Sequence, residues 1–316
     1  MQIPEFIMFV GLPGSGKSTY IKEHYLSYSI HSSDAIREEL SGDVNNQKIN
    51  TQVFDILHKR VKEDLIHGKN VVYDATNINW KRRKAFLQEL SNINCQKICT
   101  IIATPFEVCC SRNLERDRVV PNSVIERMYK SFDIPWYNEG WNDIKIIYTD
   151  INFKNMYGHY LNFLNSTANF DQHSKWHTET LGIHSVKTAR YVADNAAKLN
   201  NSIVDDVKIA AILHDCGKPS VKSFKDSKGN DSEFAHYYSH ENVGAYESLF
   251  YEKYDYSNNL LIAALIRWHM VLHFFKDWKQ KTVDKYEKEF TENKYLQEIE
   301  FYNALKLLHE GDKSAH

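Results

Sequence analysis

Residues 9–19 read FVGLPGSGKST, and the part from Gly11 to Thr19 fits the pattern GxxxxGK[ST]. The apolar run Phe6–Val10 precedes this pattern, and a segment with helical character follows it. In such a context the backbone N–H groups of the loop surround a nucleotide β-phosphate, while a lysine and a hydroxyl reach the outer phosphates and Mg²⁺. The sequence therefore predicts a site for ATP or another NTP with Mg²⁺ at Gly11, Gly14, Ser15, Gly16, Lys17, Ser18 and Thr19.

The two halves of the chain differ in their sequence patterns. The first half alternates helical segments with the β-rich runs FIMFVG, KNVVYDAT, KICTIIAT and IKIIYTD, which is typical of a parallel sheet with flanking helices. From about residue 170 onward, apolar residues recur at helical spacing and no convincing strand stands out. We therefore expect an α/β P-loop domain over 1–152, a linker region over 153–172 and an all-α domain over 173–316.

The composition limits the partners and the compartment. The formal net charge of −2 over 316 residues gives no global field that attracts nucleic acid, so such binding needs local clusters. The five cysteines lack a pair of CxxC motifs, which favours reduced thiols in a cytoplasmic setting. No stretch approaches the ~18 apolar residues of a membrane span, and the N-terminus has no signal pattern. We expect a soluble cytoplasmic protein without membrane contact, in the host cytoplasm if a phage encodes it.

Charged residues of the first half follow predicted strands, at the edge where such folds bind ligands. Asp34 can accept the proton of an attacking hydroxyl, and Arg37 shares its helix face and can hold a substrate phosphate. The alternative for Asp34 is an ordinary helix N-cap. Asp74 ends another strand, where a carboxylate can orient hydrated magnesium. Arginines that can stabilise a transferring phosphoryl group follow at Arg112, Arg116 and Arg118.

These motifs together resemble the kinase domain of bacteriophage polynucleotide 5′-kinases. The similarity runs through GLPGSGKSTY, the SDAIR spacing, DATNINWKRR, RNLER and VPNSVIERMYKSF, and it covers nearly all of the first half. It implies that Asp34 is the general base on a polynucleotide 5′-OH, that Arg37 binds the adjacent phosphate, and that Arg116 is a catalytic lid arginine beside Lys17. The chain departs from the best-known members because it has no DxDxT phosphatase motif.

The second half contains a His-Asp pair in the stretch AAILHDCGK, residues 210–218. Neighbouring helical residues point about 100° apart, so the pair can bind one metal ion only with ligands from other helices. The candidate ligands are His184, His214, Asp215 and Asp312, with His240 and His269 for a second site and His177 and His236 as further candidates. An open site of this kind suits Mn, Ni, Co, Fe or Mg, which activate water toward a phosphoester, with Asp215 as a catalytic ligand.

The ordered pattern H…HD…H…H…D resembles the HD phosphohydrolase superfamily. The stretch LHDCGKP followed by SHENVGA is especially similar to the HD domains appended to tRNA nucleotidyltransferases, and the resemblance covers residues 175–316. It implies a metal-dependent phosphatase or phosphodiesterase, with Lys218 near the substrate phosphate.

The two resemblances together imply one task. A kinase that phosphorylates a 5′-OH and a hydrolase that removes a 2′,3′-cyclic phosphate or a 2′/3′-phosphate act on opposite sides of one RNA break. The chain thus resembles bifunctional kinase–HD enzymes that heal RNA ends, although their domain order can be the reverse of this one. The expected partners are RNA ends, such as those of cleaved tRNA, and a separate RNA ligase; a homo-oligomer stays open. The alternatives are a small-nucleoside kinase fused to an HD nucleotidase, and a kinase with a non-catalytic HD module for RNA binding or oligomerisation.

Overall fold

A computed structural model describes residues 3–291 and 298–315. The chain forms two compact units, one of Met1–Met128 with Pro135–Asp150 and one of Tyr129–Ile134 with Ile151–His316. The residues predicted as a linker lie in the second unit and include the short helix α7, Asn162–Ser166. Among the described residues, no helix combines the length and the apolar character needed to cross a membrane.

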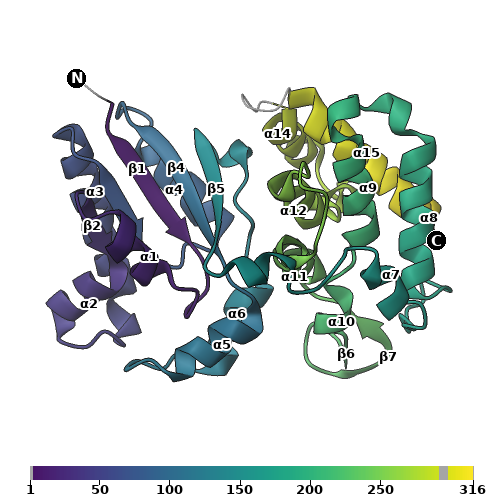
Figure 1. Ribbon diagram of the computed structural model, residues 1–316, viewed down its shortest axis with the longest axis horizontal. Helices are drawn as coiled ribbons and strands as arrows, with labels where there is room; N and C mark the ends of the chain where they lie inside the picture. The colour runs from purple at the N-terminus through teal and green to yellow at the C-terminus, as the bar shows by residue number, and fades with distance from the viewer. Residues whose placement is uncertain (1–2, 292–297, 316) are drawn as a thin grey trace. The chain divides into compact units, whose positions relative to one another are not determined.

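The first unit is built on a sheet of five parallel strands in the order β2-β3-β1-β4-β5, drawn as arrows in Figure 1. The α/β prediction is thereby confirmed. Since β1 lies in the middle, the loop that follows it opens at the carboxyl edge of the sheet, where open α/β folds bind their ligands. The strands are β1 Glu5–Val10, β2 Ser29–Ser32, β3 Val71–Asp74, β4 Gln96–Ala103 and β5 Asp143–Tyr148.

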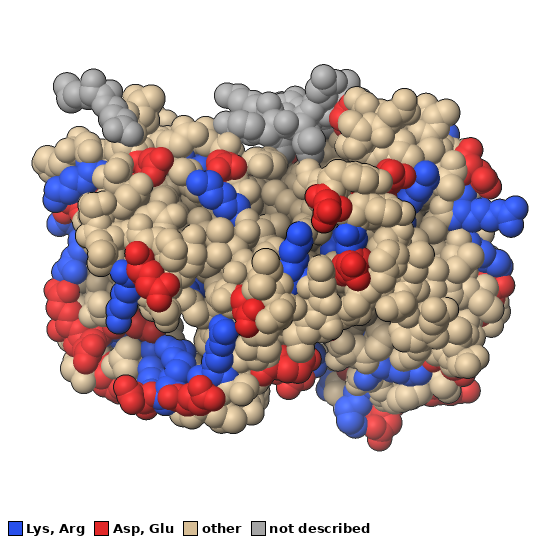
Figure 2. Space-filling view, viewed as in Figure 1, with Lys and Arg blue, Asp and Glu red and all other residues tan. Residues whose placement is uncertain are grey.

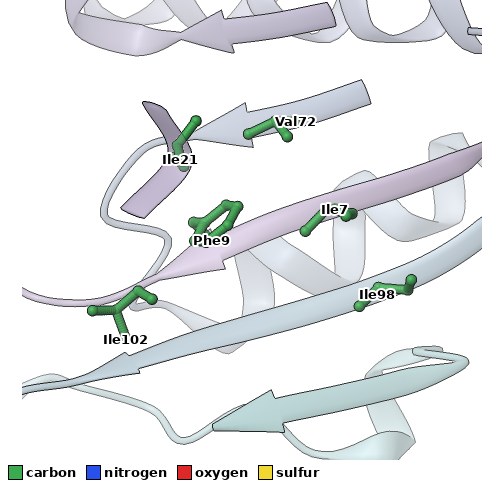
Figure 3. Packing of buried hydrophobic residues seen from close by; sticks show 6 residues of the cluster. All are labelled: Ile7, Phe9, Ile21, Val72, Ile98 and Ile102. Carbon is green, nitrogen blue, oxygen red and sulfur yellow. The ribbon is translucent and has the colours of Figure 1, made fainter. Parts of the chain in front are cut away.

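The central strands are buried on both faces, which explains why their sequences are almost continuously apolar. Phe6–Val10 of β1 is buried throughout. Figure 3 shows part of this core, in which Ile21 from the helix after the P-loop packs with five strand residues: Ile7, Phe9, Val72, Ile98 and Ile102. The packing of Ile21 fixes the P-loop helix on the sheet.

Helices flank this sheet and fill the rest of the first half. Arg83, which lies in the motif DATNINWKRR, has a structural role: its Nε and Nη2 donate to the two oxygens of Glu139 at 2.7 and 2.6 Å, and both side chains are buried. Short 3₁₀ helices lie at Gln47–Ile49 and Tyr137–Glu139. The α-helices are α1 Lys17–His24, α2 Ser33–Ser41, α3 Asn50–Ile66, α4 Trp80–Glu89, α5 Phe106–Leu114 and α6 Asn122–Lys130.

The second unit is mainly helical, as predicted, and α8, α9, α12 and α15 pack against one another as its centre. The α-helices after α7 are α8 Leu181–Asp194, α9 Val204–Leu213, α10 Lys218–Val221, α11 His240–Glu247, α12 Asn259–Trp268, α13 Val271–Phe274, α14 Gln280–Thr291 and α15 Glu298–Ser314. The 3₁₀ helices are Ile151–Asn155, Ala196–Lys198, Asn201–Ile203, Ser248–Phe250 and Phe275–Asp277. Acidic and basic side chains are interspersed over the face seen in Figure 2, in keeping with the small net charge.

The expectation that the second half has no strand is wrong. Strands β6, Ser223–Lys225, and β7, Asp231–His236, form an antiparallel hairpin. The two strands have nine residues in all, and only Ala235 among them is buried. Their sequences therefore lack the alternation of apolar and polar residues by which a strand is recognised. The local signal lies in the turn, where the Asp226 carboxylate accepts from the N–H groups of Lys228 and Asn230 at 2.8 and 2.9 Å, and Gly229 adopts φ 86°.

One buried carboxyl in this unit gives a stability prediction. Burial raises the pKa of Asp206, on α9, to about 6 from the ordinary 3.8. Because the folded-state pKa exceeds the unfolded-state pKa, ionisation of Asp206 costs stability progressively as the pH rises from about 4 to about 6, and the full cost remains above that range. Asp206→Asn keeps an acceptor for the Asn258 N–H, 3.0 Å away, and avoids that cost. We expect the substitution to stabilise the fold by about 2 kcal/mol near pH 7.5.

Thermal unfolding of wild type and variant across this pH range measures the effect. The difference between the two should vanish near pH 4 and grow until about pH 6. A difference in unfolding temperature that does not depend on pH would contradict the ionisation argument.

Candidate active sites

Two glycines of the P-loop adopt a backbone conformation that other residues rarely adopt. Gly14 adopts φ 80°, and a Cβ there would lie 2.3 Å from the backbone oxygen of Cys109. Gly16, with φ 91°, is the N-cap of α1 and turns the chain into the helix. The first backbone N–H groups of α1 therefore face the space that a phosphate occupies in P-loop proteins.

Lys17 is held inside this loop. Its Nζ donates to the carbonyl oxygens of Gly11 and Leu12, both at 2.8 Å, and to Ser15 Oγ at 3.3 Å. Burial lowers the pKa of Lys17 to about 8, against the opposing attraction of the Asp74 carboxylate. A phosphate group would replace the carbonyl partners and favour the charged ammonium.

Two further groups lie where Mg²⁺ is expected. Ser18 Oγ donates to Asp74 Oδ2 at 3.2 Å, so the first turn of α1 and the end of β3 meet there. Burial raises the pKa of Asp74, although the nearby Lys17 ammonium opposes the shift. A hydroxyl and a carboxylate in this arrangement are suitable oxygen ligands for Mg²⁺ or its water shell. Thr19 is exposed on α1.

The predicted acceptor residues form an ion pair. Asp34, at the start of α2, accepts from Arg37 Nη1 at 2.5 Å through Oδ1, and Arg37 Nη2 also donates to Asn50 at 2.8 Å. The Arg37 side chain is buried, whereas that of Asp34 is 48 % exposed and accessible to a substrate. Asp34 is not the N-cap of α2, because Ser32 occupies that position.

Arg118, one of the three arginines that the sequence pointed to, completes this group. Arg118 Nη1 lies 2.8 Å from Asp34 Oδ2, and its Nε donates to Asn45 at 2.8 Å. Each carboxylate oxygen of Asp34 thus faces a guanidinium. Arg116, the predicted lid residue, is exposed in the segment after α5. The sequence pointed to three arginines, but only the fold could show that Arg118 contacts Asp34.

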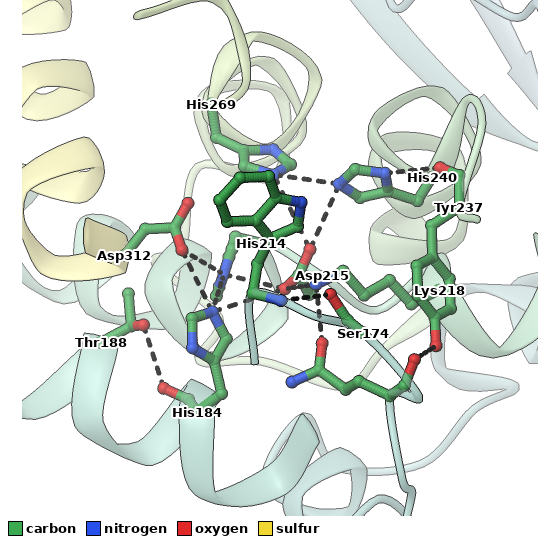
Figure 4. Close-up of polar contacts among 12 residues, drawn as sticks. Ser174, His184, Thr188, His214, Asp215, Lys218, Tyr237, His240, His269 and Asp312 are labelled. Carbon is green, nitrogen blue, oxygen red and sulfur yellow. Dashed lines mark hydrogen bonds and ion pairs between the residues drawn. The ribbon is translucent and has the colours of Figure 1, made fainter. Parts of the chain in front are cut away.

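The second unit gathers the predicted metal ligands in its buried interior (Figure 4). His184 Nε2 lies 3.2 Å from His214 Nε2, 3.5 Å from Asp215 Oδ2 and 3.1 Å from Asp312 Oδ1. His214 comes directly after α9, and Asp312 lies in the last turn of α15. Residues that are far apart in the sequence therefore converge on one point.

A second group meets at the same aspartate. His240 Nε2 and His269 Nε2 lie 3.3 and 3.8 Å from Asp215 Oδ1, and 3.3 Å from each other. Figure 4 shows Asp215 between this pair and the group around His184. The two three-ligand groups, His184–His214–Asp215 and Asp215–His240–His269, thus share one carboxylate.

Backbone hydrogen bonds fix three of these imidazoles. The Nδ1 atoms of His214, His240 and His269 lie 2.8, 2.8 and 2.7 Å from the carbonyl oxygens of Ala211, Tyr237 and Ile266, each three residues earlier. A proton on Nδ1 that donates to the carbonyl leaves the lone pair of Nε2 directed into the cluster. This is the tautomer that a metal ligand requires.

The charges in the cluster support the same interpretation. Although burial opposes it, the pKa of Asp215 is well below its usual range, because the Lys218 ammonium and His214 stabilise the carboxylate. Lys218 Nζ lies 2.7 Å from Asp215 Oδ2 and donates to Gln172 at 2.8 Å. Burial and the neighbouring His240 hold the pKa of His269 well below its ordinary value. Pairs of imidazole nitrogens near 3.2 Å beside a carboxylate fit a divalent cation that prefers nitrogen and oxygen ligands.

Two residues that contact this cluster were not predicted from the sequence. His273 Nε2 lies 2.8 Å from Asp312 Oδ2, and Gln172 holds Lys218 from within the predicted linker. Neither belongs to a motif with diagnostic spacing. Of the weaker candidates, His177 lies with its ring centre 4.8 Å from that of His184, and His236 lies in the hairpin beside a cavity.

The shared aspartate leads to a prediction about metal content. Wild-type protein should bind Mn²⁺ at both ligand groups, and His269→Ala should lower the bound Mn²⁺ by about half because one group keeps its ligands. Metal analysis after equilibrium dialysis measures the ratio. His24→Ala, which removes an exposed histidine of the first unit, is the matched control. Unchanged metal content in His269→Ala would show that the second group binds no metal.

The two units thus have the architecture of a P-loop kinase joined to an HD phosphohydrolase. Residues 6–135 match the AAA domain family, and residues 181–306 match the HD domain family. The chain therefore contains an AAA-type P-loop kinase domain followed by an HD domain. This architecture is that of an enzyme.

Similar proteins span different parts of the chain. The L-seryl-tRNA(Sec) kinase of Methanococcus maripaludis is 27% identical over 229 residues, which is 70% of this chain and 82% of that protein. Transcription factor bHLH140 of Arabidopsis thaliana is 28% identical over 157 residues, 47% of this chain, and the match spans only 16% of the plant protein. Among solved structures, one chain from the structure of the Pnkp1/Rnl/Hen1 RNA repair complex is similar. The match covers 42% of this chain and 44% of that chain, at 20% identity and a TM-score of 0.35.

Proposed function

We propose that the protein heals broken RNA ends, phosphorylating a 5′-OH in its P-loop unit and removing a 2′,3′-cyclic phosphate or 2′/3′-phosphate in its HD unit. The observation that carries this proposal is the presence, in one chain, of the Asp34–Arg37 pair in the P-loop unit and a buried HD cluster built around Asp215. Many ribonucleases leave a 5′-OH on one side of the break and a 2′,3′-cyclic phosphate on the other. Both reactions are needed before a ligase that requires 3′-OH and 5′-phosphate ends can act.

In the kinase reaction, Asp34 accepts the proton of the 5′-OH as the oxygen forms a bond to the γ-phosphorus, and the bond from that phosphorus to the β–γ bridging oxygen breaks to release ADP. Lys17 stabilises the charge that develops on the phosphates. Arg37 binds the phosphate next to the acceptor hydroxyl, which frees one oxygen of Asp34. The similarity to a kinase of seryl-tRNA supports an acceptor hydroxyl carried by RNA.

In the HD unit, a bound divalent metal would supply a Lewis acid and an activated water. His184, His214, His240, His269, Asp215 and Asp312 would hold the metal ions. Lys218 contributes a buried positive charge beside Asp215 and lines the same cavity, where it would bind a phosphoryl oxygen of the substrate. The carboxylate of Asp215 keeps that ammonium in position.

One assay tests both reactions. RNA with 5′-OH and 2′,3′-cyclic phosphate ends is incubated with ATP, Mg²⁺ and either Mn²⁺ or Ni²⁺, and both ends are analysed by mass spectrometry. Asp34→Ala should block only the 5′ reaction, and His214→Ala with Asp215→Ala only the 3′ reaction. Asp55→Ala and Asp194→Ala, which remove exposed carboxylates from the respective units, are matched controls.

The alternatives predict different products. Phosphorylation of free nucleosides with no change to oligonucleotides would favour a small-nucleoside kinase joined to a nucleotidase. A 5′-phosphate gained while the 3′ end stays unchanged with every metal would leave only the kinase part of the proposal.

A further inference from the structure

A cavity of about 630 Å³ in the HD unit extends from the metal-ligand cluster to the protein surface. Asp215, Lys218, His240 and Asp312 line its buried part. The hairpin strand β7 and the residues after it form another wall. A ligand in this cavity would therefore contact the cluster at one end and solvent at the other.

Exposed aromatic side chains are concentrated among the residues that line this cavity. They are Trp176, Phe234, Tyr238 and Phe274, at 71, 40, 49 and 46 % exposure. Large exposed rings gathered at one pocket indicate a binding surface rather than ordinary surface variation. Their positions on three separate segments show that the fold brings them together.

Neighbouring side chains hold these rings in place. His236 and Tyr238 stack with planes 6° apart and centres 5.3 Å apart, and Phe274 stacks on Trp278 at 14° and 6.2 Å. The Lys175 ammonium lies 4.8 Å from the centre of the Trp176 ring. Such rings with neighbouring cations are typical of surfaces that bind single-stranded nucleic acid, where bases stack and phosphates meet lysines.

The lysines at the exposed part of the cavity favour a phosphate-bearing ligand. Lys175 and Lys276 lie at the exposed part and Lys218 at the buried part. Glu241 is the acidic lining residue outside the ligand cluster, and its carboxylate lies 3.6 Å from His240 Nδ1. The ligand therefore meets two lysines at the exposed part, whereas at the buried part the Lys218 ammonium is paired with Asp215 Oδ2, 2.7 Å away.

We infer that Trp176, Tyr238 and Phe274 form a stacking platform for the terminal base of an RNA 3′ end, so that the phosphate of the same nucleotide reaches the cluster around Asp215. The inference rests on the proposed function and adds a determinant of substrate choice. The platform recognises a base by its face and not by its edge, so it accepts any of the four bases.

The experiment compares two RNA substrates with the same terminal 3′-phosphate, one with the base of the last nucleotide and one abasic at that position. Wild type should show a KM about tenfold lower for the substrate with the base. Trp176→Ala should raise the KM for that substrate about tenfold and leave the abasic substrate unchanged. Trp176→Phe should restore the preference because it keeps a ring. Tyr256→Ala, which removes a 70 % exposed ring elsewhere in the unit, is the control.

Two other outcomes would contradict the stacking platform. Equal KM values for the two substrates in wild type and in Trp176→Ala would overturn the platform while the end-healing function stands. Failure of wild type to release phosphate from either substrate with Mn²⁺ or Ni²⁺ would overturn the hydrolase part of the proposed function, and this inference with it.

Discussion

Asp215→Asn is expected to lower phosphate release from an RNA 3′ end by at least about 1,000-fold. Asp215 is the one residue that belongs to both ligand groups, with Oδ2 facing His184 and His214 and Oδ1 facing His240 and His269. Asparagine keeps the shape but loses the negative charge and one acceptor oxygen. A metal ion held by Asp215 would then lose several kcal/mol of stabilisation, which corresponds to this change in rate.

The same variant includes an internal control for enzyme concentration. The P-loop unit is a separate compact unit, so 5′ phosphorylation by Asp215→Asn should match that of wild type. Asp194→Asn, which changes a 69 % exposed carboxylate on α8, should affect neither reaction. Phosphate release by Asp215→Asn within about tenfold of wild type would remove this residue from the catalytic centre.

Lys17→Met is expected to lower 5′ phosphorylation of RNA by at least about 1,000-fold with no effect on the 3′ reaction. The ammonium of Lys17 is the buried cation of the P-loop, and methionine fills similar volume without charge. Initial rates with saturating ATP measure the loss. A rate within about tenfold of wild type would contradict the role of Lys17 in stabilising the transferred phosphoryl group.

The stability of this variant separates loss of chemistry from loss of fold. Burial holds the pKa of Lys17 at about 8, below the ordinary 10.5, so the charged form costs folding stability at neutral pH. Methionine removes that cost but also removes the hydrogen bonds to Gly11 and Leu12. Because these effects oppose each other, we expect no large fall in the unfolding temperature, and calorimetry of the free protein measures it.

The sequence was sufficient for the fold class because each half contains a motif with a fixed local geometry. The P-loop pattern requires a strand, a glycine turn and a helix, and the structure has them at β1, Gly14 and α1. The ordered pattern H…HD…H…H…D, which resembles that of HD phosphohydrolases, also placed His184, His214, Asp215 and Asp312 in one set, and the structure brings these residues together. Local rules of conformation suffice for the P-loop, whereas the ligand set was predicted from a pattern of residue types along the whole second half.

What escaped prediction depends on contacts between distant segments. No pattern links Arg118 to Asp34, or His273 to Asp312, because these pairs form only when loops and helix ends meet. The two carboxylate oxygens of Asp215 face different ligand groups, and this arrangement too arises only when four helices pack together. The hairpin β6–β7 was missed because its strands are largely exposed, and it provides part of the cavity wall.

The hydrogen bonds that fix His214, His240 and His269 have a thermodynamic consequence. Their rings are ordered by the backbone carbonyls of Ala211, Tyr237 and Ile266, so the conformational entropy lost in orienting them is already lost when the protein folds. A metal ion bound by these rings would then have less ordering to impose, so the loss of conformational entropy on binding would be smaller. A chelator should accordingly abolish phosphate release while the helices stay folded, so activity returns as soon as metal does.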